Sequence, residues 1–286
     1  MTDKNKLING SMLAKNIIEN IQLRWAHNKS QSSPPSLAII QVGNDHASSV
    51  YIRHKMSACR QIGFLANCFN FPDNCTQSEL TAKITDLNQD IDTHGILLQL
   101  PLPPHLDKLE LLKCIDPSKD VDAIGPTRLG NLINEHANIL PCTTAAILYL
   151  IKQTGISLPG KKVTMIGASS LVGKPTAIEL LNRHATVTVC HSQTTDLATH
   201  AKQADILIVA IGNPHVIQPS WIKKNSIVID VGINRSETGK VIGDIDTASV
   251  LDTVQFITPV PGGVGPLTVA HLVKNLYTLY CIQQTN

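Results

Sequence analysis

The sequence predicts an α/β fold in two domains, each built around a parallel sheet. Short apolar runs of strand length alternate with segments of helical period along most of the chain. A stretch rich in proline and glycine, residues 116–141, separates two series of such segments. The length of 286 residues suits one large domain or two ordinary ones, so the separation favours two.

The first half of the chain is expected to alternate strands and helices. We predict strands at residues 37–42, 66–71 and 95–100, and helices at residues 11–27, 47–62, 77–89 and 106–114. Ser11 is a suitable N-cap for the first helix, and Gly63 suits the end of the second. The stretch 116–141 is expected to be a domain junction or a loop-built site rather than a regular element.

The second half shows a denser alternation of the same kind. After a helix at residues 143–154, we predict strands at residues 163–167, 186–190, 206–210 and 227–231. The last helix, residues 267–280, lies outside this alternation. It is therefore expected to cross back and pack on the first domain.

Composition excludes several classes of partner. The formal net charge is +2 and only 16% of residues are charged, which is not the basic excess of a nucleic-acid-binding protein. No apolar run is long enough to cross a bilayer, and the N-terminus has no apolar signal core. The seven cysteines include no Cys-x-x-Cys pair, so we expect reduced thiols in a cytoplasmic protein and no metal site.

A glycine turn in the second half is the first chemical signal. The segment VTMIGASSLVG, residues 163–173, joins a buried strand to a helix that opens near Gly173. Gly167 permits a sharp turn and close approach of a diphosphate, which the helix N-terminus attracts. Ser169 replaces the middle glycine of the usual pattern, so alone the turn fits a dinucleotide site and a packing turn equally well. The dinucleotide interpretation assigns cofactor contacts to Gly167, Ala168, Ser169, Ser170, Val172 and Gly173.

The end of the next strand bears on the choice of cofactor. An NAD site usually places an acidic residue there for the ribose hydroxyls. Here the strand runs into His191, Ser192, Gln193 and Thr194 without a carboxylate. Neutral polar groups tolerate a 2′-phosphate, which favours NADP, although an ordinary polar loop would look the same.

The first half carries a candidate substrate site in the segment VGNDHASSVYIRHK, residues 42–55. Tyr51 and Lys55 are four residues apart and so share one helix face. An aromatic ring beside an ammonium group at the carboxyl end of a parallel sheet suits substrate binding. From the spacing alone, a surface lysine whose stem covers the tyrosine is the stronger alternative.

Three further segments have two interpretations each. Gln99 ends the apolar run GILLQLPLP, where it would orient a lysine or cap a loop. Asp120 and Asp122 in KDVD would bind the N–H groups of a substrate or be solvated loop acids. The segment PVPGGVGPLT, residues 259–268, is a defined turn where backbone approaches a ligand, or a rigid linker.

Together these segments closely resemble the bifunctional methylenetetrahydrofolate dehydrogenase/cyclohydrolase family. The resemblance covers essentially the whole chain, in family order, and rests on the segments VGNDHASSVYIRHK, GILLQLPLP, KDVD, GASSLVG, ATVTVCHSQT, ADILIVAIG, VIDVGIN, GDID and ITPVPGGVGPLT. It implies a folate-active domain, residues 1–140 completed by the helix 267–286, and a Rossmann-like NADP-binding domain, residues 141–266, with a cleft between them. It also implies a homodimer.

The resemblance implies a two-step reaction on tetrahydrofolate derivatives. NADP oxidises 5,10-methylenetetrahydrofolate to the 5,10-methenyl compound, which is hydrolysed to 10-formyltetrahydrofolate for one-carbon metabolism and purine biosynthesis. Lys55 would activate water and carry the proton, and Gln99 would hold its amine. Tyr51 would stack on the aminobenzoate ring, Asp122 would accept the pterin N–H groups, and Ser49 would support them. The remaining contacts implied are Pro261, Gly262 and Gly263 for substrate, and Ile211, Gly212 and Ile233 for cofactor.

Several residues depart from the family pattern. Ala168 stands where the family usually has an arginine that contacts the 2′-phosphate of NADP. Ala123, Gly125 and Arg128 replace a glycine, a histidine and an asparagine, and Thr144 and Ala146 replace a proline and a glycine. Ala123 is expected to be strained where only glycine fits. Two alternatives rest on these changes: a dehydrogenase with weak or lost cyclohydrolase activity, and a non-catalytic folate- or nucleotide-binding relative. A dehydrogenase for another substrate, such as a keto acid, leaves the first-half pattern unexplained.

Overall fold

The computed structural model describes residues 6–28, 33–214 and 216–285. These residues form two compact units, which we name after their main sheets. The three-stranded unit comprises the described residues of 15–142 and 269–285. The five-stranded unit comprises residues 6–14 and the described residues of 143–268. Both units contain parallel sheets with helices, so the predicted α/β class is confirmed.

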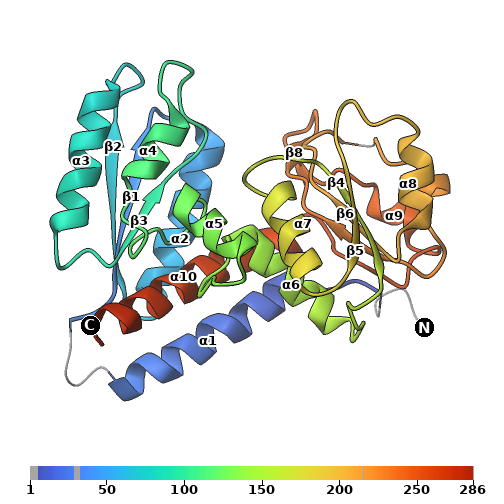
Figure 1. The fold of residues 1–286 in the computed structure, drawn as a ribbon, viewed down its shortest axis with the longest axis horizontal. Helices are drawn as coiled ribbons and strands as arrows, with labels where there is room; N and C mark the ends of the chain where they lie inside the picture. Colours follow the sequence, from blue (N-terminus) through green and yellow to red (C-terminus); the bar gives the residue numbers. More distant parts are fainter. Residues whose placement is uncertain (1–5, 29–32, 215, 286) are drawn as a thin grey trace. The chain divides into compact units, whose positions relative to one another are not determined.

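The three-stranded unit is built on a parallel sheet in the order β2-β1-β3. The central strand β1 (Ser36–Val42) is buried along its whole length, as is β3 (Gly95–Leu98), whereas β2 (Leu65–Phe71) is partly exposed. The helices α2 (His46–Gln61), α3 (Gln77–Gln89) and α4 (Lys108–Cys114) surround this sheet in Figure 1. The continuous apolar sequence of β1 and β3 follows from this burial on both faces.

Two expectations about this part of the chain were wrong. Ser11 is not the N-cap of the first helix, since α1 (Gly10–Asn28) begins one residue earlier. The side chain of Asn9 takes the capping role and accepts a hydrogen bond from the Met12 amide at 2.9 Å. The stretch 116–141 contains a regular helix, α5 (Pro126–Ile133), with proline at its first position, where its missing N–H costs nothing.

The five-stranded unit is a parallel sheet in the order β10-β7-β6-β4-β5. Helix α6 (Cys142–Gln153) precedes it. The strands in chain order are β4 (Lys162–Ile166), β5 (Thr186–Cys190), β6 (Ile206–Val209), β7 (Ile227–Asp230) and β10 (Phe256–Ile257). The elements between them are α7 (Gly173–Asn182), α8 (Leu197–Gln203), a short 3-10 helix η3 (Pro219–Trp221), the antiparallel pair β8 (Asn234–Arg235) and β9 (Val241–Ile242), and α9 (Thr247–Val250). Figure 1 shows this sheet with α7 and α8 beside it.

The last helix, α10 (Val264–Gln283), contributes to the core of the three-stranded unit. Tyr280 contacts the ring of Trp25 edge-on at 5.8 Å, and Tyr277 stacks on Phe64 at 5.9 Å between ring centroids. Trp25 and Phe64 are also in edge-on contact, at 5.7 Å. Such aromatic pairs stabilise a core beyond the area they bury. Among the described helices, none is long and apolar enough for a membrane span.

A buried histidine on α10 predicts a pH dependence of stability. Burial, and to a smaller extent the charge of nearby Lys274, lower the pKa of His271 to about 4. Between pH 6.5 and pH 4 the unfolded chain therefore binds a proton that the folded chain excludes, so the free energy of unfolding falls as the pH falls. From pH 7.5 to pH 5 this loss amounts to about 2 kcal/mol.

The substitution His271→Gln should remove this loss. Urea unfolding of the variant and the original protein at pH 7.5 and pH 5 gives the free energy of unfolding of each. The original protein should lose about 2 kcal/mol more than the variant between the two pH values. Burial raises the pKa values of Asp120 and Asp230 to about 6, which acts in the opposite direction, but equally in both proteins. Equal losses in the variant and the original protein would contradict the assignment to His271.

Candidate functional sites

The start of α2 fixes the candidate catalytic residues of the three-stranded unit. Asp45 caps this helix, since its carboxylate accepts a hydrogen bond from the Ser48 amide at 2.7 Å. Tyr51 and Lys55 follow on one face of the helix. The Lys55 side chain is only 8% exposed, so it is not the surface lysine of the alternative interpretation. Tyr51 is half-buried, and burial raises the pKa of its hydroxyl.

Gln99, the residue after β3, is hydrogen-bonded to Lys55. The side-chain nitrogen of Lys55 donates a hydrogen bond to the Gln99 side-chain oxygen at 3.0 Å. The amide end of the same side chain donates to the Leu100 carbonyl at 2.6 Å, and the Gln99 backbone amide donates to the Ile40 carbonyl at 2.9 Å. Both ends of the Gln99 side chain are thus engaged, which leaves its oxygen facing the lysine.

Asp122 lies near Lys55, because both side chains affect the pKa of the buried Cys142 thiol. Burial raises the pKa of Cys142 well above its usual value, and the charge of Asp122 and a hydrogen bond with it raise it further. The charge of Lys55 acts on the same thiol in the opposite direction. Asp122 and Lys55 therefore both lie close to Cys142, within the three-stranded unit.

Sequence reasoning missed the residue that holds this loop. The Asn275 side-chain amide, on α10, donates to the carbonyls of Val121 at 3.1 Å and Leu140 at 2.9 Å, and to the Cys142 sulfur at 3.5 Å. Asn275 is only 5% exposed. It fixes the backbone on both sides of the loop that carries Asp122. No pattern near Asn275 in the sequence could have indicated this role, because its partners lie more than a hundred residues away.

Three of the departures from the family pattern, Ala123, Gly125 and Arg128, follow Asp122 in the chain. Ala123 has a φ of 57°, the strained left-handed conformation expected there. Asp120 stabilises this turn by accepting hydrogen bonds from the amides of Ala123 at 3.0 Å and Gly125 at 2.8 Å. Arg128 is buried and donates to the Asn138 side chain at 2.6 Å. The changed residues are thus accommodated inside the fold.

Ser49 lies two residues before Tyr51 in α2, and its side chain is hydrogen-bonded within the three-stranded unit. Its hydroxyl donates to the Asp45 carbonyl at 2.9 Å and accepts from the Gln41 side chain at 3.1 Å. These contacts fix the start of α2 against the end of β1. A supporting role, rather than a chemical one, fits this arrangement.

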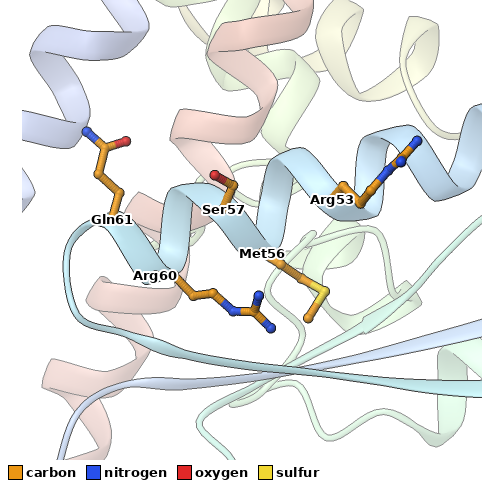
Figure 2. A pocket seen from close by; sticks show the side chains of 5 residues that line it. All are labelled: Arg53, Met56, Ser57, Arg60 and Gln61. Carbon is orange, nitrogen blue, oxygen red and sulfur yellow. The ribbon is translucent and has the colours of Figure 1, made fainter.

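A separate pocket of about 470 Å³ lies along α2. Figure 2 shows its lining side chains, which are Arg53, Met56, Ser57, Arg60 and Gln61. These residues are at helical positions on the side away from Tyr51 and Lys55. The pocket is therefore distinct from the candidate catalytic residues.

The five-stranded unit places its glycine turn at the point where the strand order reverses. The chain leaves β4 to one side for β5 and returns to the other side for β6. In open parallel sheets, ligands bind outside the carboxyl ends of the two strands at such a point. The turn after β4 begins at Gly167, and the loop after β6 begins at Ala210. These two segments touch, since a Cβ on Gly167 would lie 2.2 Å from the Ala210 carbonyl oxygen.

The turn itself is tightly packed at its ends and open in the middle. A Cβ on Gly173 would lie 1.9 Å from the carbonyl oxygen of Gly167, so only glycine fits there. The Ser169 hydroxyl accepts hydrogen bonds from the amides of Val172 at 3.2 Å and Gly173 at 3.5 Å. Ser169 and Ser170 are exposed, and Ala168 is half-buried. The serine in place of the middle glycine therefore ties the turn to Val172 and to the first residue of α7.

The end of β5 carries no free acidic side chain near this turn. The backbone amide of His191 donates to the Thr194 hydroxyl at 2.9 Å, and Ser192 is exposed. The first carboxylate after β5 is Asp196, whose side chain caps α8 through the Thr199 amide. An acid for the ribose hydroxyls is therefore not at the expected position, in agreement with an NADP site.

The remaining predicted contact residues follow three strands of this unit, β6, β7 and β10. The amides of Ile211 and Gly212 donate to the Asp244 carboxylate, and the Ile233 side chain is 49% exposed. In the turn 261–263, the Gly262 carbonyl accepts from the Ser11 amide at 3.0 Å. Within the described residues, no cluster of histidine, cysteine or acidic side chains suits a metal ion.

Comparison with known proteins relates both units to one family. Residues 8–122 match the catalytic domain of tetrahydrofolate dehydrogenase/cyclohydrolase, and residues 141–284 match the NAD(P)-binding domain of the same family. The bifunctional protein FolD of Ruthia magnifica is 44% identical over 96% of this chain and 98% of its own length.

Solved structures give the same relationship. The bifunctional FolD dehydrogenase/cyclohydrolase from Campylobacter jejuni is 42% identical, with a TM-score of 0.93, over 96% of this chain and 99% of its own. The Trypanosoma brucei enzyme, solved with NADP and an inhibitor, is 35% identical with a TM-score of 0.94, over 98% of both chains.

Proposed function

This chain belongs to the tetrahydrofolate dehydrogenase/cyclohydrolase family, and we propose that it oxidises 5,10-methylenetetrahydrofolate with NADP and hydrolyses the product to 10-formyltetrahydrofolate. One observation supports this most strongly: the buried side-chain nitrogen of Lys55 is held by Gln99 at 3.0 Å in the unit that matches the family's catalytic domain.

Lys55 is the proposed proton carrier of the hydrolysis. Water must lose a proton as it adds to the methenyl carbon, and the side-chain nitrogen of Lys55, one helical turn after Tyr51, takes it when it is a neutral amine. Gln99 holds the amine in place, since its own side chain is fixed at both ends. Tyr51 provides a half-buried ring for stacking on the aminobenzoate group. Asp122 provides the carboxylate for the pterin N–H donors.

The glycine turn of the five-stranded unit fits the diphosphate of NADP. Exposed Ser169 and Ser170 lie at the start of α7, whose N-terminus favours anions. The cofactor, when bound, accepts the hydride from the one-carbon bridge of the substrate. The protein contributes position: we assign contacts to Gly167, Ala168, Ser169, Ser170, Val172 and Gly173, to His191, Ser192 and Thr194, and to Ile211, Gly212 and Ile233. The turn of Pro261, Gly262 and Gly263 is assigned to the substrate.

Further parts of the proposal concern organisation in the cell. We assign folate chemistry to residues 1–140 with the helix 267–286, and dinucleotide binding to residues 141–266. The protein is proposed to act as a cytoplasmic homodimer that supplies one-carbon units for purine biosynthesis. Chemical cross-linking and light scattering of the purified protein test the dimer.

Assays of both activities on purified protein test the proposed function. Hydride transfer is followed by absorbance of the reduced cofactor with NADP and with NAD, and hydrolysis by loss of methenyl absorbance. We expect both activities, with NADP preferred. Cofactor binding without either reaction would contradict the proposal.

Because Ala168 has no group that contacts a 2′-phosphate, we expect that a substitution at this position can increase the preference for NADP over NAD. A guanidinium group at this position would make a bidentate contact with a 2′-phosphate, worth about 1.5–3 kcal/mol. Ala168→Arg should therefore lower KM for NADP about tenfold or more and leave KM for NAD unchanged. Steady-state kinetics with each cofactor measure both values, and Ala168→Gln provides a neutral side chain of similar reach as control. An equal change for both cofactors would contradict a 2′-phosphate beside residue 168.

A further inference from the structure

A buried carboxylate in the five-stranded unit receives four donors from two different loops. One oxygen of Asp244 accepts hydrogen bonds from the backbone amides of Ile211 at 2.8 Å and Gly212 at 3.1 Å. The other oxygen accepts from the Asn213 amide at 3.0 Å and from the Asn234 side chain at 2.8 Å. Asp244 has no exposed surface, so water cannot replace these contacts.

A second carboxylate lies beneath the first and fixes its backbone. Asp230, the last residue of β7, accepts hydrogen bonds from the amides of Gly232 at 2.9 Å, Asp244 at 3.1 Å and Ile245 at 2.9 Å. Thr258 ties Asp230 to the next strand through its hydroxyl, which accepts from the Asp230 amide at 2.8 Å. The segment 243–245 is thus attached to the carboxyl end of a central strand.

Two glycines show how closely the backbone encloses these acids. A Cβ on Gly232 would lie 2.2 Å from the carboxyl carbon of Asp244, and a Cβ on Gly243 would lie 2.0 Å from an oxygen of Asp230. Side chains are excluded at both positions because carboxylates occupy the space. The loops are therefore shaped around the two acids, and Asp244 has no room for another orientation.

We propose that Asp244 is a positioning residue for the dinucleotide, holding the loops after β6 and β7 at the cofactor site. The loop 210–213 leaves β6 at the point where the strand order reverses and touches Gly167 of the glycine turn. Asn234 follows directly after Ile233. Asp244 thus connects two segments that carry proposed cofactor contacts while touching no ligand itself. This inference rests on the proposed function only for the identity of the cofactor.

Asp244→Asn tests the role with nearly the same shape. The asparagine side chain has one acceptor oxygen. Its NH₂ group takes the place of the second carboxylate oxygen and faces N–H donors, with which it cannot form hydrogen bonds. We expect the dissociation constant of NADPH, measured by its fluorescence, and KM for NADP to rise about tenfold or more, since contacts to a charged acceptor are lost. Hydrolysis of the methenyl substrate needs no nucleotide, so its kcat and KM should be unchanged.

Asp246→Asn is the matched control. Asp246 is two residues away and exposed, and its side chain only caps α9 through the Ala248 amide. It should bind NADPH as the original protein does. Asn234→Ala removes only one of the four donors and is expected to weaken NADPH binding by about threefold.

The outcomes separate the inference from the proposed function. Unchanged NADPH binding in Asp244→Asn would overturn the inference. If Asp244→Asn fails to fold, Asn234→Ala takes its place as the test. Unchanged NADPH binding in Asn234→Ala would then overturn the inference. Absence of both folate reactions in the original protein would overturn the proposed function, while the binding comparison would still test the role of Asp244.

Discussion

Lys55→Met should abolish hydrolysis of the methenyl substrate while leaving dinucleotide binding intact. Methionine keeps the length and the apolar stem of lysine, so the buried position remains filled. It removes the amine assigned as the proton acceptor, and a positioned acid–base group contributes about 10²–10⁴-fold to rate. The loss of methenyl absorbance measures hydrolysis, and fluorescence of NADPH measures binding.

The comparison with an exposed lysine makes this result specific. Lys113 pairs with Glu110 on the surface of α4, where such a pair contributes little to stability. Lys113→Met should change neither activity.

Gln99→Ala should reduce hydrolysis less than Lys55→Met, because the amine stays present but loses its hydrogen bond at 3.0 Å. Full cyclohydrolase activity in Lys55→Met would remove Lys55 from the mechanism.

Local patterns predicted the regular elements well. Helix α3 and strand β5 have the predicted bounds, and the apolar runs placed the other main strands within one or two residues. Helix α5 was missed because Pro126 and Gly130 suggested a loop, although proline at the first helical position is favourable. The pair β8 and β9 and strand β10 are two residues long, too short to show any periodicity.

Contacts between distant residues set the limit of prediction at the sites. The spacing of Tyr51 and Lys55 gives a shared helix face, but not whether that face is buried. The hydrogen bond from Lys55 joins it to Gln99, 44 residues away. The residues alone suggested that Gln99 orients a lysine or caps a loop, and the resemblance to a family identified Lys55 as that lysine. Asn275 reaches Val121 across 154 residues, and no periodicity or motif indicates that pairing. Asp244 lies in the recognised segment GDID, yet its four donors come from loops that only the fold brings together.

Gly173→Ala should remove dehydrogenase activity and spare hydrolysis. The added Cβ would lie 1.9 Å from the carbonyl oxygen of Gly167 and 3.0 Å from the Cα of Ala168. Both neighbours are backbone atoms, so the glycine turn must shift as a whole and move its N–H groups away from the diphosphate. We expect NADPH binding to weaken by about 100-fold, as for the loss of two charge-assisted hydrogen bonds.

Gly130→Ala provides the matched control for this change. Gly130 lies in α5, and a Cβ there would meet no atom within 4 Å. Alanine also favours the helix by about 1 kcal/mol, so this variant should keep both activities. In Gly173→Ala the cyclohydrolase rate shows whether the three-stranded unit is folded, because Lys55, Gln99 and Asp122 all belong to it, and circular dichroism compares the fold of the whole variant with that of the original protein. If Gly173→Ala bound NADPH normally, the turn after β4 would not be the dinucleotide site.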